Sequence, residues 1–196
     1  MGSKERKETH KQNIRASILK TARDMVANGG WQGVSIRKLA SAIEYTAPII
    51  YEHFENKDTL LRELISDGFR RMLQKIEKTI NKSLSQKKQL YRFANAYFDF
   101  ASKNCDLYQL MFWSNYNVQY NIPPDLKKII GVFRNYSKEP YIENNVPNRT
   151  DELIIDLLCI IHGYISLGLI SKIPEINGKT EKFCKRAIKT HIKSMF

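Results

Sequence analysis

The chain has 196 residues, 42% of them apolar, and carries 32 Lys and Arg against 20 Asp and Glu, a formal net charge of +12 at pH 7. This apolar fraction is high enough for a buried core, which excludes a globally disordered chain. The positive surplus makes polyanions, either nucleic acid or anionic lipid, the first partners to consider.

The three cysteines, Cys105, Cys159 and Cys184, form no CxxC pair, no zinc-ligand spacing and no disulfide framework. This usage is typical of a reducing cytoplasm. The first twelve residues hold no apolar stretch that would make a signal peptide. We therefore expect a cytoplasmic protein with no metal ion and no other cofactor.

The positive charge is concentrated in three patches. Residues 1–40 hold nine basic and three acidic side chains, residues 70–92 hold eight basic residues against Glu77, and residues 172–196 hold seven against two. Because the patches are spread along the chain, charge alone does not locate a binding face. We interpret the patch at 70–92 as a solvated helix and loop rather than a second nucleic-acid surface.

The first predicted helix spans 11–28, because its apolar residues recur at helical spacing. Asn28-Gly29-Gly30 ends it, since glycine adopts the left-handed cap conformation without a Cβ clash. Ser35 is a suitable N-cap for a short helix over 36–43. Its inward-facing residues are expected to be Ile36, Leu39, Ala40 and Ile43.

Glu44-Tyr45 is too short to be anything but a turn, and Thr46 is placed to cap the next helix, which runs to about Phe54. Pro48 is acceptable in its first turn, where backbone N–H groups have no partner in the helix. Asn56 then caps a fourth helix whose apolar period continues to Ile76. No segment in this stretch alternates like a strand.

The rest of the chain is also helical in pattern. Helices are expected over 89–103, 106–113, 125–137, 150–171 and 178–196, with Thr150 and Thr180 as caps and a loop over 139–149. The apolar segment 153–170 is close to the length that spans a bilayer. Asp156 and His162 inside it would be costly there, so we interpret it as a buried or interface helix, with His162 as a core residue.

The two short helices over 35–43 and 46–54 have the proportions of a helix-turn-helix, in which the second helix enters the major groove of DNA. Ile50 and Phe54, four residues apart, are placed to face the core. The side chains with suitable sizes for base edges or phosphates are Thr46, Ala47, Ile49, Tyr51 and His53. Lys57, in the first turn of the next helix, is placed to meet a phosphate.

Residues 14–61 resemble the DNA-binding domain of the TetR family of bacterial transcriptional regulators. The matching run is IRASILKTARDMVANGGWQGVSIRKLASAIEYTAPIIYEHFENKDTLL. The family pattern is met at Ile18, Ala22, Gly29, Ser35, Ile36, Leu39, Ala40, Tyr51, His53, Phe54, Lys57 and Leu60. Lys38 departs from it, because the family often has an acid there that completes a capping box. The expected recognition helix reads TAPIIYEH, without the small residue and glycine that are common there in the family. Ile49 suits contact with a thymine methyl group, whereas DNA phosphates would repel Glu52.

The resemblance implies an all-α protein with a three-helix DNA-binding domain and a helical ligand-binding and dimerisation domain. We expect the DNA-binding domain at 10–56 with its helix-turn-helix at about 35–54, a connecting helix at 57–80, and the regulatory domain at 81–196. It also implies a homodimer built on the helices at 150–171 and 178–196. The expected DNA-binding residues are Ser35, Arg37, Lys38, Thr46, Ala47, Pro48, Ile49, Tyr51, His53 and Lys57.

The aromatic-rich segment 91–116 suits either a filled core or the lining of a cavity for an apolar or aromatic effector. The resemblance implies an effector pocket in this half, and the first candidates are Phe98, Met111, Phe112 and Tyr164. The predicted function is a ligand-responsive repressor that binds a palindromic operator in double-stranded DNA as a dimer. An activator of the same architecture and a non-specific basic protein on DNA or a membrane surface remain alternatives. No catalytic motif supports an enzyme.

Overall fold

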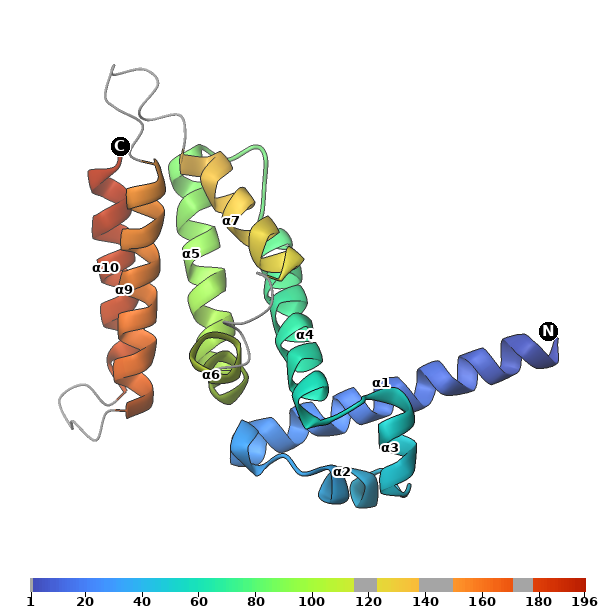
Figure 1. Cartoon of the computed structure of the whole chain (residues 1–196). Coiled ribbons are helices and arrows are strands. Elements are labelled where there is room, and N and C mark those ends of the chain that lie inside the picture. Colours follow the sequence, from blue (N-terminus) through green and yellow to red (C-terminus); the bar gives the residue numbers. More distant parts are fainter. Residues whose placement is uncertain (1, 115–122, 138–149, 171–177) are drawn as a thin grey trace. The chain divides into compact units, whose positions relative to one another are not determined.

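The computed structural model describes residues 2–114, 123–137, 150–170 and 178–196, and every regular element within these ranges is helical (Figure 1). The all-α prediction is therefore confirmed. The loop expected over 139–149 lies outside the described residues. The elements are α1 (Ser3–Gly29), the 3₁₀ turn η1 (Trp31–Gly33), α2 (Ile36–Ala42), α3 (Ala47–His53), α4 (Lys57–Glu77), α5 (Gln86–Lys103), α6 (Cys105–Trp113), α7 (Pro124–Ser137), α9 (Thr150–Ile170) and α10 (Thr180–Ser194).

The chain divides into two compact units. The first comprises residues 1–69 together with 104–122, and the second comprises 70–103 together with 123–196. One division falls inside α4, and α6 belongs to the first unit although it follows α5 directly. The domain boundaries expected near residues 56 and 80 separate functions, whereas the two compact units are defined by packing alone. These boundaries therefore stay predictions.

Helix α1 begins at Ser3, so it is longer than the helix over 11–28 that its apolar residues predicted. The added turns are polar and exposed, and the backbone N–H of Gly2 donates to Glu5 Oε2 at 2.8 Å. The predicted end is confirmed: Gly30 has φ +69°, and its N–H donates to the carbonyl of Val26 at 2.9 Å. A left-handed φ of this kind favours glycine.

Apolar residues from all the N-terminal helices meet in the core of the first unit. The fully or almost fully buried ones include Ile18, Ala22, Val26, Leu39, Ala40, Ile50, Leu60, Leu61 and Leu64. Helix α6 packs against α1 and η1, and its Phe112 ring lies edge-on to Phe69 of α4, with centroids 5.2 Å apart. The N-terminal unit is therefore more than a three-helix domain, since α6 completes it.

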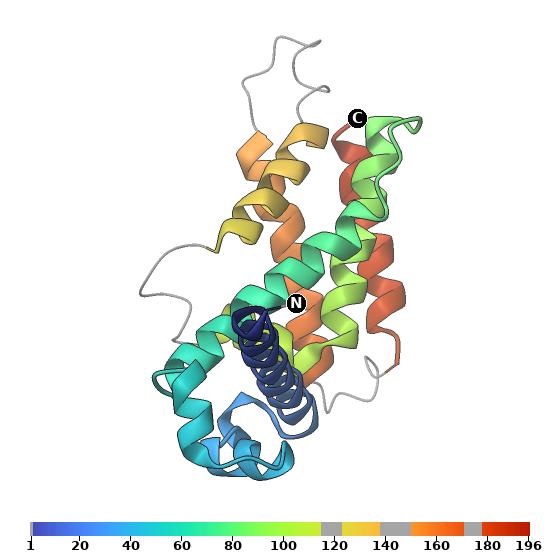
Figure 2. The same cartoon turned by 90° about the vertical axis from the view of Figure 1, so that its right-hand side faces the viewer.

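The second unit is a bundle in which α5 packs against α7, α9 and α10 (Figures 1 and 2). Phe93 of α5 and Phe133 of α7 have ring centroids 4.8 Å apart. Helix α9 packs along α10, so its apolar residues meet protein there. Among the described residues, no helix combines the length and the apolar character that a membrane crossing requires.

Two of the predicted caps lie at the starts of long helices. Asn56 is confirmed, because its Oδ1 accepts hydrogen bonds from the N–H and the hydroxyl of Thr59 at 2.8 and 3.0 Å. The prediction that Thr180 caps the last helix is wrong, because Lys179 is the N-cap of α10 and Thr180 is the first helical residue. The Thr180 side chain packs instead on α9, where a Cβ added to Gly168 would lie 3.1 Å from its methyl group.

Candidate nucleic-acid interface

The turn between α2 and α3 is held by backbone hydrogen bonds. The N–H of Tyr45 donates to the carbonyl of Ala40 at 2.9 Å, and the N–H of Glu44 donates to the carbonyl of Ser41 at 3.2 Å. This pair of bonds is the Schellman pattern of a helix C-terminus. It places Glu44 at φ +59°, the left-handed region in which a side chain is strained. The chain reverses sharply here, and α2 packs directly on α3.

The inward faces of the two short helices agree with the prediction. Ile50 is fully buried and Phe54 is 2% exposed, as their four-residue spacing indicated. Leu39 and Ala40 are also buried, whereas Ile36 and Ile43 are half-buried at the edge of the core. Ile50 is the single buried residue of α3, so six of its seven positions keep contact with solvent.

The expected DNA-binding residues all lie on α2 and its N-cap, the cap and body of α3, and the first residue of α4. Five of them are exposed: Arg37, Lys38, Thr46, Pro48 and Tyr51. Five are half-buried: Ser35, Ala47, Ile49, His53 and Lys57. The structure thus brings these ten positions together around one small helical pair, and their contact with DNA stays a prediction.

Ser35 and Thr46 occupy the predicted N-cap positions with extended backbone, but neither hydroxyl makes a capping hydrogen bond. The carbonyl of Ser35 accepts the first bond of α2 from Leu39, so the backbone alone starts the helix. The expected capping role of the two side chains is wrong. Both hydroxyls are consequently not used to start these helices.

His53 ends α3 and is half-buried, with its Nδ1 buried and without a hydrogen-bond partner. Burial lowers the pKa of His53 below 6.5, the charges of Lys11 and Arg15 lower it further, and Glu52 opposes them. The protein without DNA therefore favours the neutral imidazole of His53 more than an ordinary histidine does.

Lys57 begins α4, and its Nζ donates to the carbonyl of Gln32 in η1 at 3.4 Å. The ammonium group is therefore held beside the loop that precedes α2, close in sequence to Ser35. This contact has no counterpart in the sequence pattern. It orients the lysine that the sequence assigns to phosphate contact.

Two arginines of α1 hold α4 in place, and the sequence reasoning assigned neither. Arg15 forms an ion pair with Glu63 at 3.3 Å, and its guanidinium lies 4.9 Å from the centroid of the Phe54 ring. Arg23 bonds to Asp67 at 2.8 Å, and the Asp67 side chain is only 8% exposed. The available signal was the acid itself, because Asp67 lies among apolar positions of α4 and such a buried carboxylate needs a partner.

The four candidate effector-binding residues are divided between the units. Phe98 and Tyr164 belong to the second unit, and Met111 and Phe112 belong to the first. Phe98 and Met111 are buried, and Phe112 also contacts Tyr108, with ring centroids 4.6 Å apart. His162, expected in the core, is only half-buried, and its Nε2 lies 3.1 Å from the hydroxyl of Tyr97.

Helix α3, which buries a single residue, follows α2 through a tight Schellman turn, and α2 packs on α1. This arrangement is typical of a helix-turn-helix DNA-binding domain. Residues 18–64 match the family model described as bacterial regulatory proteins of the tetR family. The match covers 47 of the 196 residues and identifies the N-terminal domain as a helix-turn-helix domain of the TetR type.

Solved structures share the fold over nearly the whole chain. A protein of unknown function from Rhodococcus sp. RHA1 has a TM-score of 0.73 and 18% identity, with 92% of this chain and 94% of that chain covered. The TetR-family transcriptional regulator PfmR from Thermus thermophilus has a TM-score of 0.60 and 17% identity, covering 90% and 97%. The regulator FadR from Bacillus subtilis, solved with stearoyl-CoA, has a TM-score of 0.67 and 13% identity, with 90% of this chain and 97% of that chain covered. No curated protein matches the sequence.

Proposed function

We propose that this protein is a ligand-responsive repressor that binds a palindromic operator as a homodimer. The observation that carries the proposal is α3, a recognition helix with one buried residue and with Tyr51 52% exposed. One such helix reads few base pairs. Two copies related by a two-fold axis read two half-sites, which gives the specificity that regulation requires.

Homodimer formation is supported by an apolar stripe on α9. Ile155, Cys159, Gly163 and Leu167 are all exposed and follow one another every four residues, so they lie on one face of the helix. Ile155 is 59% and Leu167 47% exposed in the single chain. Burying such a face against a second copy gains hydrophobic free energy. The exposed side of α10, by contrast, is basic, so α9 would supply most of the apolar contact.

The response to an effector is supported by the separate second unit and by the fold shared with FadR, which was solved with stearoyl-CoA. An effector that binds better to a state with the wrong separation of recognition helices lowers operator affinity. Helix α4 is continuous across both units and is the natural lever. Phe98 and Tyr164 stay candidates for contacts with an apolar effector in the second unit.

Selection of bound sequences from a pool of random duplexes tests the proposal directly. We expect enrichment of an inverted repeat with two half-sites about one helical turn apart. The same affinity for all duplexes, with only a steep salt dependence, would contradict it and favour the non-specific basic DNA-binding alternative.

Sedimentation of the variant Ile155→Arg tests the dimer. We expect the wild type to sediment as a dimer and the variant as a monomer, because a charge would be buried in the interface. Lys128→Glu on the exposed side of α7 is the control and should remain dimeric. A dimer in both variants would exclude this face of α9 from the interface.

A further inference from the structure

Two basic segments that lie far apart in the sequence come together in the second unit. Residues 78–98 contain five Lys or Arg and no Asp or Glu, and residues 182–196 contain five and none. The first segment leads into and forms most of α5, the second forms most of α10, and these two helices pack against each other. The start of α5 and the end of α10 therefore bring cationic side chains of both segments close together.

This surface is hollowed. A groove of about 510 Å³ lies between the start of α5 and the end of α10. Its apolar wall consists of Leu84, the ring of Tyr91 and Ile192, which is 2% exposed. A volume of this size is in the range of small-molecule sites, and an apolar wall removes the hydrocarbon part of a ligand from water.

The rim of the groove is cationic. It is formed by Lys87, Lys88 and Arg92 from α5 and by Lys189 and Lys193 from α10. In the described part of the chain, none of the five forms an ion pair with a carboxylate; Lys87 lies over the ring of Phe196, with Nζ 5.6 Å from its centroid. Five cations that repel one another around a hollow attract an anion.

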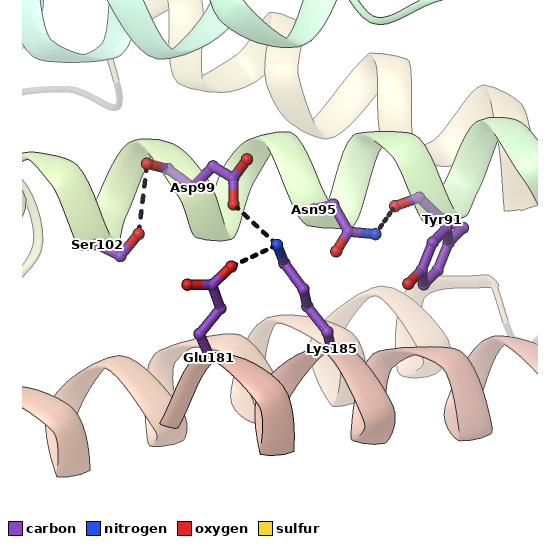
Figure 3. A network of polar contacts seen from close by, with 6 residues as sticks. All are labelled: Tyr91, Asn95, Asp99, Ser102, Glu181 and Lys185. Atoms are coloured by element: carbon purple, nitrogen blue, oxygen red, sulfur yellow. Dashed lines mark hydrogen bonds and ion pairs between the residues drawn. The ribbon is translucent and has the colours of Figure 1, made fainter. Parts of the chain in front are cut away.

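The next hollow along α5 differs from the groove, because one of its lysines is paired with acids. This hollow of about 410 Å³ shares Tyr91 and Arg92 with the groove. There Lys185 lies between two acids, 2.6 Å from Glu181 and 3.6 Å from Asp99 (Figure 3). Its charge is therefore balanced inside the protein. The unbalanced charge lies at the other end, around Lys189 and Lys193.

We propose that the groove between α5 and α10 binds an amphiphilic anion, a molecule with an apolar chain or ring and one phosphate or carboxylate group. The apolar part lies against Leu84, Tyr91 and Ile192, and the anionic group lies at Lys189 and Lys193. A small inorganic anion would leave the apolar wall unused, and the phosphates of duplex DNA would not enter the hollow. The inference rests on the proposed function for its regulatory meaning, since it names a ligand class for the regulator.

Calorimetric titration with dodecyl phosphate below its critical micelle concentration tests the proposal, with the full chain and without DNA. We expect saturable one-to-one binding that weakens with salt, and no binding of inorganic phosphate or of neutral dodecyl maltoside at the same concentrations. The double variant Lys189→Gln/Lys193→Gln should bind about tenfold more weakly, because two charges at the anionic group are lost. Leu84→Gln on the apolar wall should weaken binding several-fold, on the order of the transfer free energy of that side chain.

The matched control is Lys182→Gln/Arg186→Gln, which removes the same charge from the same helix outside the groove. It should bind within about twofold of the wild type, since neither side chain lines the groove and salt weakens the interaction of charges that do not touch the ligand. Equal weakening in both double variants would overturn the proposal, as would inorganic phosphate binding as tightly as dodecyl phosphate. Binding to anionic phosphatidylglycerol vesicles without binding of the monomer would overturn it in favour of a membrane surface. Because DNA is absent, failure here leaves the operator result untouched.

Discussion

The hydroxyl of Tyr97 on α5 lies 3.1 Å from Nε2 of His162 on α9, and this bond joins the two helices inside the second unit. The rings are 6.0 Å apart between centroids. Burial lowers the pKa of His162 from 6.5 to about 4. The imidazole is therefore neutral at pH 7, and its protonation opposes folding.

The first prediction concerns pH. Because the pKa of His162 is lower in the folded than in the unfolded chain, its contribution to stability is full above pH 6.5 and is lost as the pH falls towards 4. Between pH 7.5 and pH 5 we expect a loss of about 2 kcal/mol in the free energy of unfolding. Urea unfolding should show this slope in the wild type and in Tyr97→Phe, and a flatter one in His162→Gln. The same slope in all three proteins would assign the pH effect to other groups, among them His53, whose pKa is also lowered.

The second prediction concerns the turn of the helix-turn-helix. Glu44 has φ +59°, so Glu44→Gly should stabilise the protein by about 0.5–1 kcal/mol, because glycine adopts this conformation without strain. Glu44→Ala is the matched control and should give no comparable gain, since alanine retains a Cβ. Thermal unfolding measures both, and equal stabilisation by glycine and alanine would point to the lost charge instead.

The third prediction concerns the ion pairs between α1 and α4. Asp67→Asn should destabilise the first unit by about 1–3 kcal/mol, because it breaks a mostly buried pair with Arg23. Glu63→Gln, one turn earlier on the same helix, removes the partly exposed pair with Arg15 and should cost less than about 0.5 kcal/mol. Similar losses in chemical denaturation would show that burial does not distinguish the two pairs.

The fourth prediction concerns the close approach of α4 and α6. A Cβ added to Gly68 would lie 2.6 Å from Sδ of Met111, so Gly68→Ala should cost about 1–3 kcal/mol. Gly131 of α7 has open space around its Cα, and Gly131→Ala should instead stabilise by about 0.5–1 kcal/mol. In the background Met111→Ala, the cost of Gly68→Ala should disappear. A cost that is the same with and without Met111 would contradict this packing.

The fifth prediction concerns DNA. Lys38 is exposed on α2, and Lys38→Ala should weaken operator binding while the dependence of log affinity on log salt becomes shallower by about one. Lys128→Ala, an exposed lysine of α7, is the control and should leave the slope unchanged. Tyr51→Ala should also lower affinity without altering the fold, since the side chain is half exposed. An unchanged slope in Lys38→Ala would remove that residue from the phosphate contacts.

Much of the candidate interface could be predicted from local pattern. The helical spacing of apolar residues placed Ile50 and Phe54 inward, and Gly30 and Asn56 marked a helix end and a helix start. These features depend on residues within four positions of each other, so a sequence displays them directly. The capping hydrogen bonds of Ser35 and Thr46 failed, because a suitable residue in a cap position does not fix its rotamer.

The aromatic segment 91–116 shows where local pattern was insufficient. The sequence pattern presented it as one aromatic set that suits either a filled core or a cavity lining, yet the aromatic residues of α5 belong to the second unit and those of α6 to the first. Whether an apolar helix faces one core or another depends on which distant helices cover it. In the same way, Asp67 and His162 could be recognised as polar residues in apolar helices, but not assigned to Arg23 and Tyr97.

The charge pattern shows most clearly which features can be predicted from the sequence and which exist only in the folded chain. The composition and the spacing over residues 14–61 were sufficient for an all-α protein with a helix-turn-helix, because both follow from short-range periodicity and turn chemistry. The basic patches at 70–92 and 172–196 are separate along the sequence, and the first was interpreted as a solvated helix and loop. Packing of α5 against α10 joins them around one apolar groove, and proximity between residues a hundred positions apart exists only in the folded chain.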